Sequence, residues 1–140
     1  MVLFQHIVIP IASEQDAQTT CVALDPYLDH VERVTAVHVI EKAGGAPDKA
    51  PLEKRQSDAE RFLRNIDYTL SDRVEVETET VYGTDVVAAL FDAAEAIEGD
   101  AIAFRPRGGS RIKRLLSGDV ASRLVVDPPV PVMALPANNS

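Results

Sequence analysis

The fold of this chain is indicated first by His6-Ile7-Val8-Ile9-Pro10-Ile11, a short apolar run rich in branched side chains. The run is continuous rather than alternating, which is typical of a strand buried on both faces of a parallel sheet. Three later stretches have the same character, at residues 34–40, 101–104 and 130–135. Residues 74–81 instead alternate Val or Thr with Glu. That period of two predicts a strand with one solvated face, near the edge of the sheet.

Helical periodicity separates the first two strands. Apolar positions recur there at steps of three and four, which predicts a helix with one buried face. These positions are Ala17, Cys21, Leu24, Leu28 and Val31. Ser13 is the expected N-cap, and Pro26 is the expected point of interruption because proline breaks the helical hydrogen-bond ladder.

The same periodicity predicts three further helices. One lies within residues 52–70 and another follows the expected cap Asp85 and ends at Gly99. A last short helix has Val120, Leu124 and Val125 facing inward and stops before Asp127-Pro128-Pro129. Strand and helix therefore alternate along the chain, which predicts an α/β fold with a five-stranded parallel sheet and helices on both faces. We expect one domain over residues 1–140.

Composition narrows the class of protein. The net charge of −8 argues against a nucleic-acid binder, which would need a positive face. The basic residues comprise ten Arg and only four Lys, and an acidic, lysine-poor surface suits a salt-rich cytoplasm, so a halophilic source is a hypothesis. No apolar run is long enough to span a bilayer, so we expect a cytoplasmic protein without membrane insertion. The lone Cys21 excludes an internal disulfide.

Residues 107–120 carry a resemblance to a known family. They read Arg-Gly-Gly-Ser-Arg-Ile-Lys-Arg-Leu-Leu-Ser-Gly-Asp-Val, which resembles the signature loop of the universal stress protein family. Residues 6–11, 82–84 and 129–135 resemble the first strand, the turn before the third helix and the closing strand of that family. The resemblance covers nearly the whole chain, and it implies a Rossmann-like fold of the adenine nucleotide alpha hydrolase type and a role in the stress response.

The resemblance also implies where a nucleotide would bind. Nucleotide-binding members carry Gly-x-x-Gly, nine residues, then Gly-Ser or Gly-Thr, because glycines let the backbone approach a phosphate. Gly108 and Gly118 match this pattern, whereas Arg105 and Asp119 replace its first glycine and its hydroxyl residue. The aspartate that ends the first strand in such members is absent. The resemblance thus implies a degenerate nucleotide site, formed by Ala12, Val39, Arg105, Arg107, Gly108, Gly118 and Asp119.

Asp119 is the more serious departure. Two like charges 4 Å apart repel by about 4 kcal/mol at an effective dielectric of 20, before hydration and screening reduce the penalty. A basic cluster supports the opposite view, because arginine side chains bind phosphate well and could replace lost backbone donors. That cluster comprises Arg105, Arg107, Arg111, Lys113 and Arg114.

Several functions remain open on these residues. We expect a stress protein that acts by protein–protein interaction, without robust ATP binding, with an unidentified protein partner. It is expected to form a homodimer through the closing strand Val130–Leu135, as the family does. The alternatives are an adenine-nucleotide sensor, with ATP as candidate cofactor, and a regulatory partner of a membrane transporter. Slow ATP hydrolysis has little support: no catalytic residue set and no metal-ligand set is visible, so no enzyme is expected.

Overall fold

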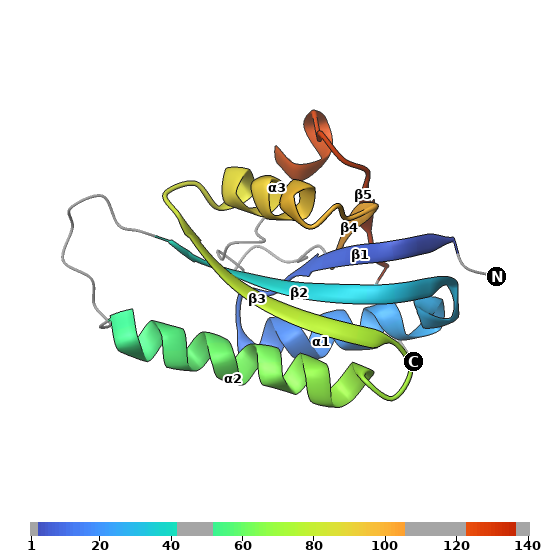
Figure 1. Ribbon diagram of the computed structural model, residues 1–140, viewed down its shortest axis with the longest axis horizontal. Helices are drawn as coiled ribbons and strands as arrows, with labels where there is room; N and C mark the ends of the chain where they lie inside the picture. The colour runs from blue at the N-terminus through green and yellow to red at the C-terminus, as the bar shows by residue number, and fades with distance from the viewer. Residues whose placement is uncertain (1–2, 42–51, 106–122, 137–140) are drawn as a thin grey trace.

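The computed structural model describes residues 3–41, 52–105 and 123–136 (Figure 1). Its elements are, in chain order, β1 (Phe4–Pro10), α1 (Glu14–Leu24), the 3-10 helix η1 (Asp25–His30), β2 (Val31–Glu41), α2 (Leu52–Leu70), β3 (Glu75–Gly83), α3 (Val86–Ala96), β4 (Ala101–Phe104) and β5 (Val132–Ala134). A short helical turn at residues 123–126 precedes β5.

The strands form one five-stranded sheet in the order β3-β2-β1-β4-β5. All four strand pairs are parallel, which confirms the predicted fold class. β1 lies at the centre and is bonded to β2 on one side and to β4 on the other. The chain therefore moves outward from β1 to β3 and then returns to build β4 and β5 on the opposite side.

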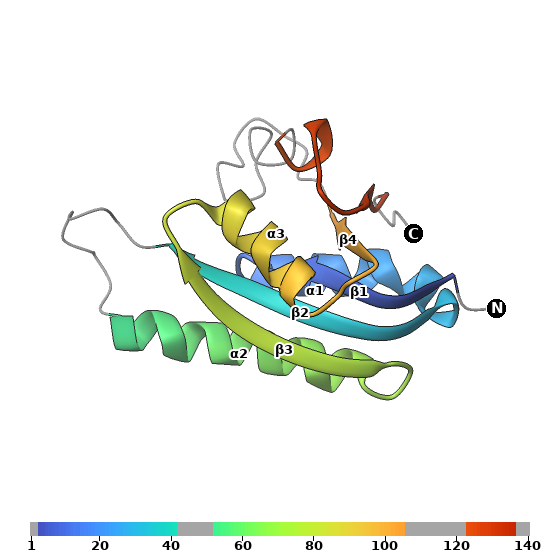
Figure 2. The ribbon, with the colours of Figure 1, turned by 45° about the horizontal axis from the view of Figure 1, so that its top comes forward.

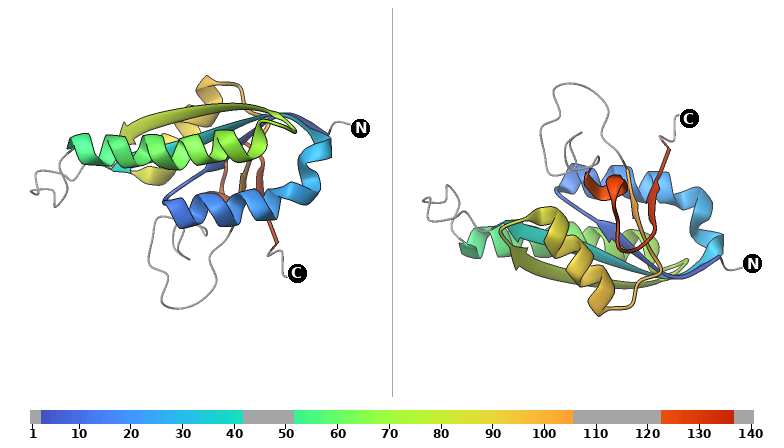
Figure 3. Two further views of the ribbon diagram at one scale, coloured as in Figure 1. Left: turned by 90° about the horizontal axis from the view of Figure 1, so that it is seen from below. Right: turned by 90° about the horizontal axis from the view of Figure 1, so that it is seen from above.

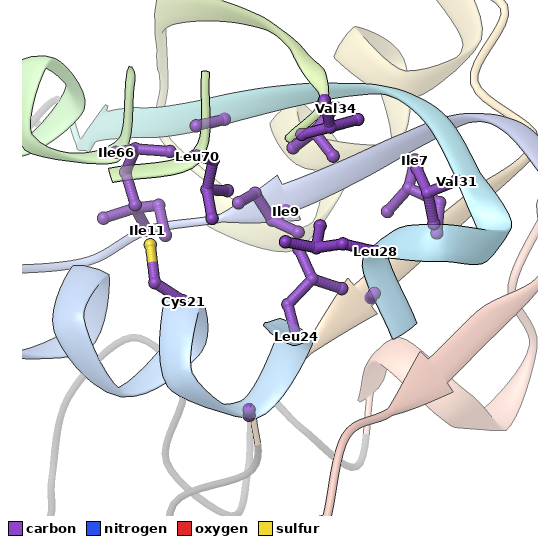
Figure 4. Packing of buried hydrophobic residues seen from close by; sticks show 14 of the residues in the cluster. Ile7, Ile9, Ile11, Cys21, Leu24, Leu28, Val31, Val34, Ile66 and Leu70 are labelled. Carbon is purple, nitrogen blue, oxygen red and sulfur yellow. The ribbon is translucent and has the colours of Figure 1, made fainter. Parts of the chain in front are cut away.

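The helices cover both faces of this sheet (Figures 1 and 2). α1 and α2 lie on one face, and α3 and the turn at residues 123–126 lie on the other, as the views from below and above also show (Figure 3). Each face has its own apolar core. Ile9, Leu24 and Ile66 belong to the core on the α1 side, part of which Figure 4 shows, and Val8, Leu90 and Leu124 belong to the core on the α3 side.

The alternating stretch forms the edge strand β3, as predicted. Glu75, Glu77 and Glu79 are all exposed, while β1 and β2 in the sheet interior are buried along most of their lengths. The strand runs from Glu75 to Gly83, slightly later than the predicted 74–81. Charged side chains on an edge strand oppose pairing with another chain, because they would have to lose water on contact.

The first helix begins and breaks where the sequence predicts. The hydroxyl of Ser13 caps α1, and the chain changes to the 3-10 helix η1 at Asp25, immediately before Pro26. Val31 does not lie on a helix, however. It begins β2, so the buried helical stripe ends at Leu28 and the next buried position already belongs to the sheet.

The prediction that Gly99 ends the third helix is wrong in its detail. α3 ends at Ala96, and the residue with a left-handed backbone is Glu98, whose φ is 58°. The amides of Glu98 and Gly99 donate to the carbonyls of Glu95 and Ala94, the pattern of a Schellman cap. Gly99 is needed for space instead, because a Cβ there would lie 2.8 Å from Cγ2 of Val8.

The end of the chain also differs from its prediction. β5 spans Val132–Ala134 rather than residues 130–135, and Val125 is 50% exposed instead of facing inward, whereas Leu124 is fully buried as predicted. Pro131 lies just before the strand, and its carbonyl accepts a hydrogen bond from the Ile102 amide of β4. In the parts of the chain that are described, no helix is both long and apolar enough to cross a bilayer.

Candidate functional site

The reversal of strand order between β1 and β4 marks the place to search for a site. In open parallel sheets, ligands bind beyond the carboxyl ends of the strands, at the point where the strand order reverses. β1 ends at Pro10 and leads into Ile11 and Ala12, and β4 ends at Phe104 and leads into Arg105. Of the predicted site residues, Arg107, Gly108, Gly118 and Asp119 lie outside the described residues.

The backbone amide of Ala12 is already engaged. Oδ2 of Asp16 accepts it at 2.7 Å, while the Asp16 amide donates to the hydroxyl of Ser13 at 3.1 Å. Asp16 is fully buried at the first turn of α1, where a carboxylate is favoured by the positive end of the helix. The chain therefore places a buried carboxylate beside the end of β1.

Sequence reasoning missed Asp16, although the signal was present. Ser13-Glu14-Gln15-Asp16 resembles a capping box, in which the third residue after the cap reaches back to the chain before the helix. Here the acidic side chain reaches one residue further back, to the amide of Ala12 instead of Ser13. Such a closed turn satisfies two donors that a bound ligand could otherwise accept from.

His38 forms a hydrogen bond with the backbone of Ile11, the residue before Ala12. Its Nδ1–H donates to the carbonyl of Ile11 at 2.7 Å, and its ring packs edge-on against Phe62 of α2, with the ring centres 5.6 Å apart. Burial is the main reason that the pKa of His38 lies below its ordinary value. A neutral imidazole therefore fixes the carboxyl end of β1 against β2 and α2, a role that the strand pattern did not reveal.

Ala12 and Val39, two of the predicted site residues, line the same cavity. They share a small cavity on the α3 side, which is lined by Pro10, Ile11, Ala12, Val37, Val39, Val86 and Leu90. Its volume is about 10 Å³, roughly the minimum that a single water requires. The lining is almost entirely apolar, so the described part of the predicted site offers little room and few polar groups.

The start of α3 is closed in a similar way. Asp85 caps the helix by accepting the Ala88 amide at 3.1 Å, which confirms the predicted cap. Its other oxygen accepts a hydrogen bond from Arg123 at 2.8 Å. The Arg123 bond, followed by the bond from Ala88, holds the pKa of Asp85 below its ordinary value. The pair also ties the turn at residues 123–126 to α3.

Two further side chains behave as structural groups. Cys21 is buried against the α1-side core, and burial raises the pKa of its thiol to about 11, so it is protonated and unreactive at neutral pH (Figure 4). Across residues 3–41, 52–105 and 123–136, no three His, Cys, Asp or Glu side chains gather in a group that could hold a metal ion.

Comparison with known proteins decides the family. The family model described as "Universal stress protein family" matches residues 3–136, nearly the whole chain. The chain belongs to the universal stress protein family. The matched range includes the turn at Ala12, the strand end at Val39 and the loop that begins at Arg105.

Solved structures of the family share the fold at low sequence identity. A universal stress protein from Archaeoglobus fulgidus is 19% identical with a TM-score of 0.71, and the alignment covers 96% of this chain and 100% of that one. One from Burkholderia pseudomallei is 23% identical with a TM-score of 0.70, covering 95% and 96%. An Arabidopsis thaliana family protein, solved with AMP bound, is 14% identical with a TM-score of 0.65, covering 96% and 92%. A search of curated proteins finds no match.

Proposed function

We propose that this universal stress protein acts through contacts with other protein chains and binds ATP weakly or not at all. The observation that carries the proposal is the closed turn after β1. Asp16 occupies the Ala12 amide at 2.7 Å, and the cavity between Ala12 and Val39 measures about 10 Å³. Ligand pockets for small molecules commonly measure about 300–1,000 Å³.

Opening this cavity for an adenine ring would disturb the core. Val39, Val86 and Leu90 line it and are 5%, 9% and 0% exposed, so the ring could enter only by displacing packed side chains. A close-packed interior resists such a change, with overpacking costing about 1–3 kcal/mol per site. Asp119 adds charge repulsion at the position where the family's hydroxyl residue would contact phosphate.

Isothermal titration of ATP, ADP and AMP with magnesium tests the proposal. We expect no heat of binding at ligand concentrations of a few hundred micromolar, because the lost donors and the closed cavity act together. A triple variant, Ala12→Asp/Arg105→Gly/Asp119→Ser, restores the family pattern and should gain measurable affinity. Arg105→Gly alone is the matched control and should stay silent. Binding of ATP by the unmodified protein at micromolar affinity would refute the proposal.

A second candidate is an adenine-nucleotide sensor. It is supported by Arg105, which directly follows β4 at the carboxyl edge of the sheet, and by the family protein from Arabidopsis thaliana that was solved with AMP bound. In this case arginine side chains would replace the lost backbone donors. Arg105→Glu should then abolish AMP binding, and Arg123→Glu, which removes an arginine from the Asp85 pair, should not. Equal affinity of Arg105→Glu and unmodified protein would exclude this candidate.

We also propose that the chain pairs with a second copy through β5. The Ile102 amide donates to Pro131 and the Leu135 amide donates to Phe104, so residues 131, 133 and 135 turn their backbone groups toward β4. The backbone groups of Val132 and Ala134 therefore point toward the open edge, because consecutive residues of a strand point in opposite directions. An apolar edge strand with such groups is a template for pairing.

A further inference from the structure

An apolar pocket lies on the α1 side of the sheet, beside the start of β1, whereas Ala12 of the predicted nucleotide site follows the end of that strand. Its volume is about 430 Å³. The start of β1, the end of α1 with η1, and β5 surround it, and we call it the β5 pocket. Phe4, Ile7, Leu24, Tyr27, Met133 and Leu135 are among its lining residues. It is more than large enough for one small organic molecule.

The pocket lies where the outer strand β5 meets the α1-side core. Leu135 is a buried member of that core, and Met133 packs against it. Leu24 at the end of α1 and Tyr27 in η1 reach the pocket from the helical side.

The chemistry of the lining selects the class of ligand. Among the described lining residues, only Tyr27 and His30 carry side chains that can form hydrogen bonds, and the rest are apolar. Leu3 and Tyr27 are 61% and 40% exposed, so the pocket opens to solvent between them and the apolar lining is partly wet. Burying this surface beneath an apolar molecule is favourable by about 25 cal/mol for each Å² removed from water.

Charge near the opening argues against an anionic ligand. Tyr27 and His30 lie in η1 between Asp25 and Asp29, and the whole chain carries a net charge of −8. Arg73 forms ion pairs with both aspartates, and its Nη2 lies 3.6 Å from Oδ1 of Asp29. These pairs neutralise part of the negative charge of Asp25 and Asp29. An uncharged molecule avoids both the repulsion and the cost of losing its water.

If two copies pair through antiparallel β5 strands, the two-fold axis is perpendicular to the sheet, and each copy's Met133 stays on the same face as its own pocket. The pocket is then present once in each chain. Coverage of the pocket by the second copy is one of the outcomes that the test below distinguishes.

We propose that the β5 pocket binds one small uncharged molecule with an apolar body and a single hydrogen-bonding group, which Tyr27 or His30 contacts. The inference is independent of the nucleotide and partner proposals, because none of the pocket residues lines the cavity at Ala12. The site faces the opposite side of the sheet from that cavity, so the two could be occupied at once.

The neutral fluorophore N-phenyl-1-naphthylamine tests the site. Its emission should rise in a saturable way with one probe bound per chain, and Tyr27→Glu should weaken this binding at least tenfold by placing a charge in the opening. Tyr68→Glu is the matched control: Tyr68 is 86% exposed on α2 and lines no part of the pocket, so its affinity should equal that of the unmodified protein. Leu3→Glu provides a second opening variant if Tyr27→Glu fails to fold.

Methyl NMR locates the bound probe. The sequence contains two methionines, Met1 and Met133, so labelling their methyl groups gives one reporter in the pocket. Saturating probe should shift the Met133 signal. No saturable binding, an unmoved Met133 signal, or equal affinity of the Tyr27→Glu and Tyr68→Glu variants would overturn the proposal. Probe binding that splits a dimer during sedimentation would also overturn it, because a second copy would then have filled the pocket.

Discussion

At the end of α3, the left-handed backbone and the close approach of another strand fall on two neighbouring residues, Glu98 and Gly99. Glu98 adopts the left-handed backbone, with φ of 58°, and Gly99 leaves space for the side chain of Val8. A left-handed conformation costs an ordinary L-residue about 1–2 kcal/mol, whereas glycine adopts it without that penalty. The backbone strain therefore lies at Glu98, whereas Gly99 is required because a side chain there would overlap Val8.

Substitution at the two positions should change stability in opposite directions. Glu98→Gly should raise the free energy of unfolding by about 0.5–1 kcal/mol, since relief of the backbone exceeds the added chain entropy. Gly99→Ala should lower it by about 1–3 kcal/mol, because the new Cβ overlaps Val8. Urea denaturation measures both. In a Val8→Ala background the cost of Gly99→Ala should fall markedly, and an unchanged cost would show that the contact is not its cause.

His6 is a buried histidine that the fold keeps neutral. Its Nδ1 accepts from Arg33 at 3.2 Å, so the proton lies on Nε2 and is donated to Oγ1 of Thr35 at 2.6 Å. Burial first, and the charge of Arg33 second, lower the pKa of His6 from its ordinary value of 6.5. Protonation would place a hydrogen on the nitrogen that faces the Arg33 guanidinium.

Stability should therefore decline on the acid side of pH 6.5. Above that pH both states are neutral at His6 and its contribution is fully present. Below it the unfolded chain takes up a proton that the folded chain resists, and stability falls by up to roughly 1.4 kcal/mol per pH unit for each such group. His38, with its lowered pKa, acts in the same direction. Chemical denaturation between pH 5 and 8 should show a shallower slope for His6→Gln, with His30→Gln as the control for loss of one histidine. An equal slope in His6→Gln would contradict this.

At the scale of elements, β5 is the strand through which we propose that two copies pair. It has three residues, and Val132 and Ala134 turn their backbone groups outward. The opposite edge strand, β3, is longer and is protected by its glutamates. Self-association is therefore expected at β5 alone of these two edges.

Removing one outward donor should separate the proposed dimer. Ala134→Pro deletes an N–H that points away from β4, so the internal sheet bonds remain while pairing with a second copy is weakened. Sedimentation velocity should show a shift toward monomer. Ala134→Val keeps the donor and should remain a dimer. A dimer of unchanged strength in Ala134→Pro, with an unchanged unfolding temperature, would place the interface elsewhere.

The whole molecule carries a surplus of negative charge, −8 over 140 residues. Self-repulsion of like charges destabilises the compact state, and salt screens it, with a Debye length of about 10 Å at 0.1 M and about 3 Å at 1 M. The aligned glutamates of β3 concentrate part of this repulsion on one strand.

Added potassium chloride should accordingly stabilise the fold. Between roughly 0.1 and 1 M salt we expect a gain of about 1 kcal/mol, or roughly 3–5 °C in the unfolding midpoint for a chain of this size. Differential scanning calorimetry measures it. The triple variant Glu75→Gln/Glu77→Gln/Glu79→Gln should be more stable at low salt and respond less. A midpoint independent of salt would refute a role for self-repulsion.

Local sequence was enough to determine the order of strands and helices and the family. Continuous apolar runs, helical periodicity, and the caps Ser13 and Asp85 act over a few residues, so they can be read in order along the chain. The loop pattern around Gly108 and Gly118 indicated the family. The residues Arg105 and Asp119, which depart from that pattern, led to the prediction that ATP binds weakly or not at all.

Tertiary structure alone decided the features that join distant parts of the chain. The bond from His38 to Ile11 spans 27 residues, and Gly99, in the turn after α3, lies against Val8 of β1. The β5 pocket is lined by residues from both ends of the chain, near Phe4 and near Met133. Periodicity shows that a side chain is buried, but not which side chain it meets, because contact across a sheet depends on strand order and register.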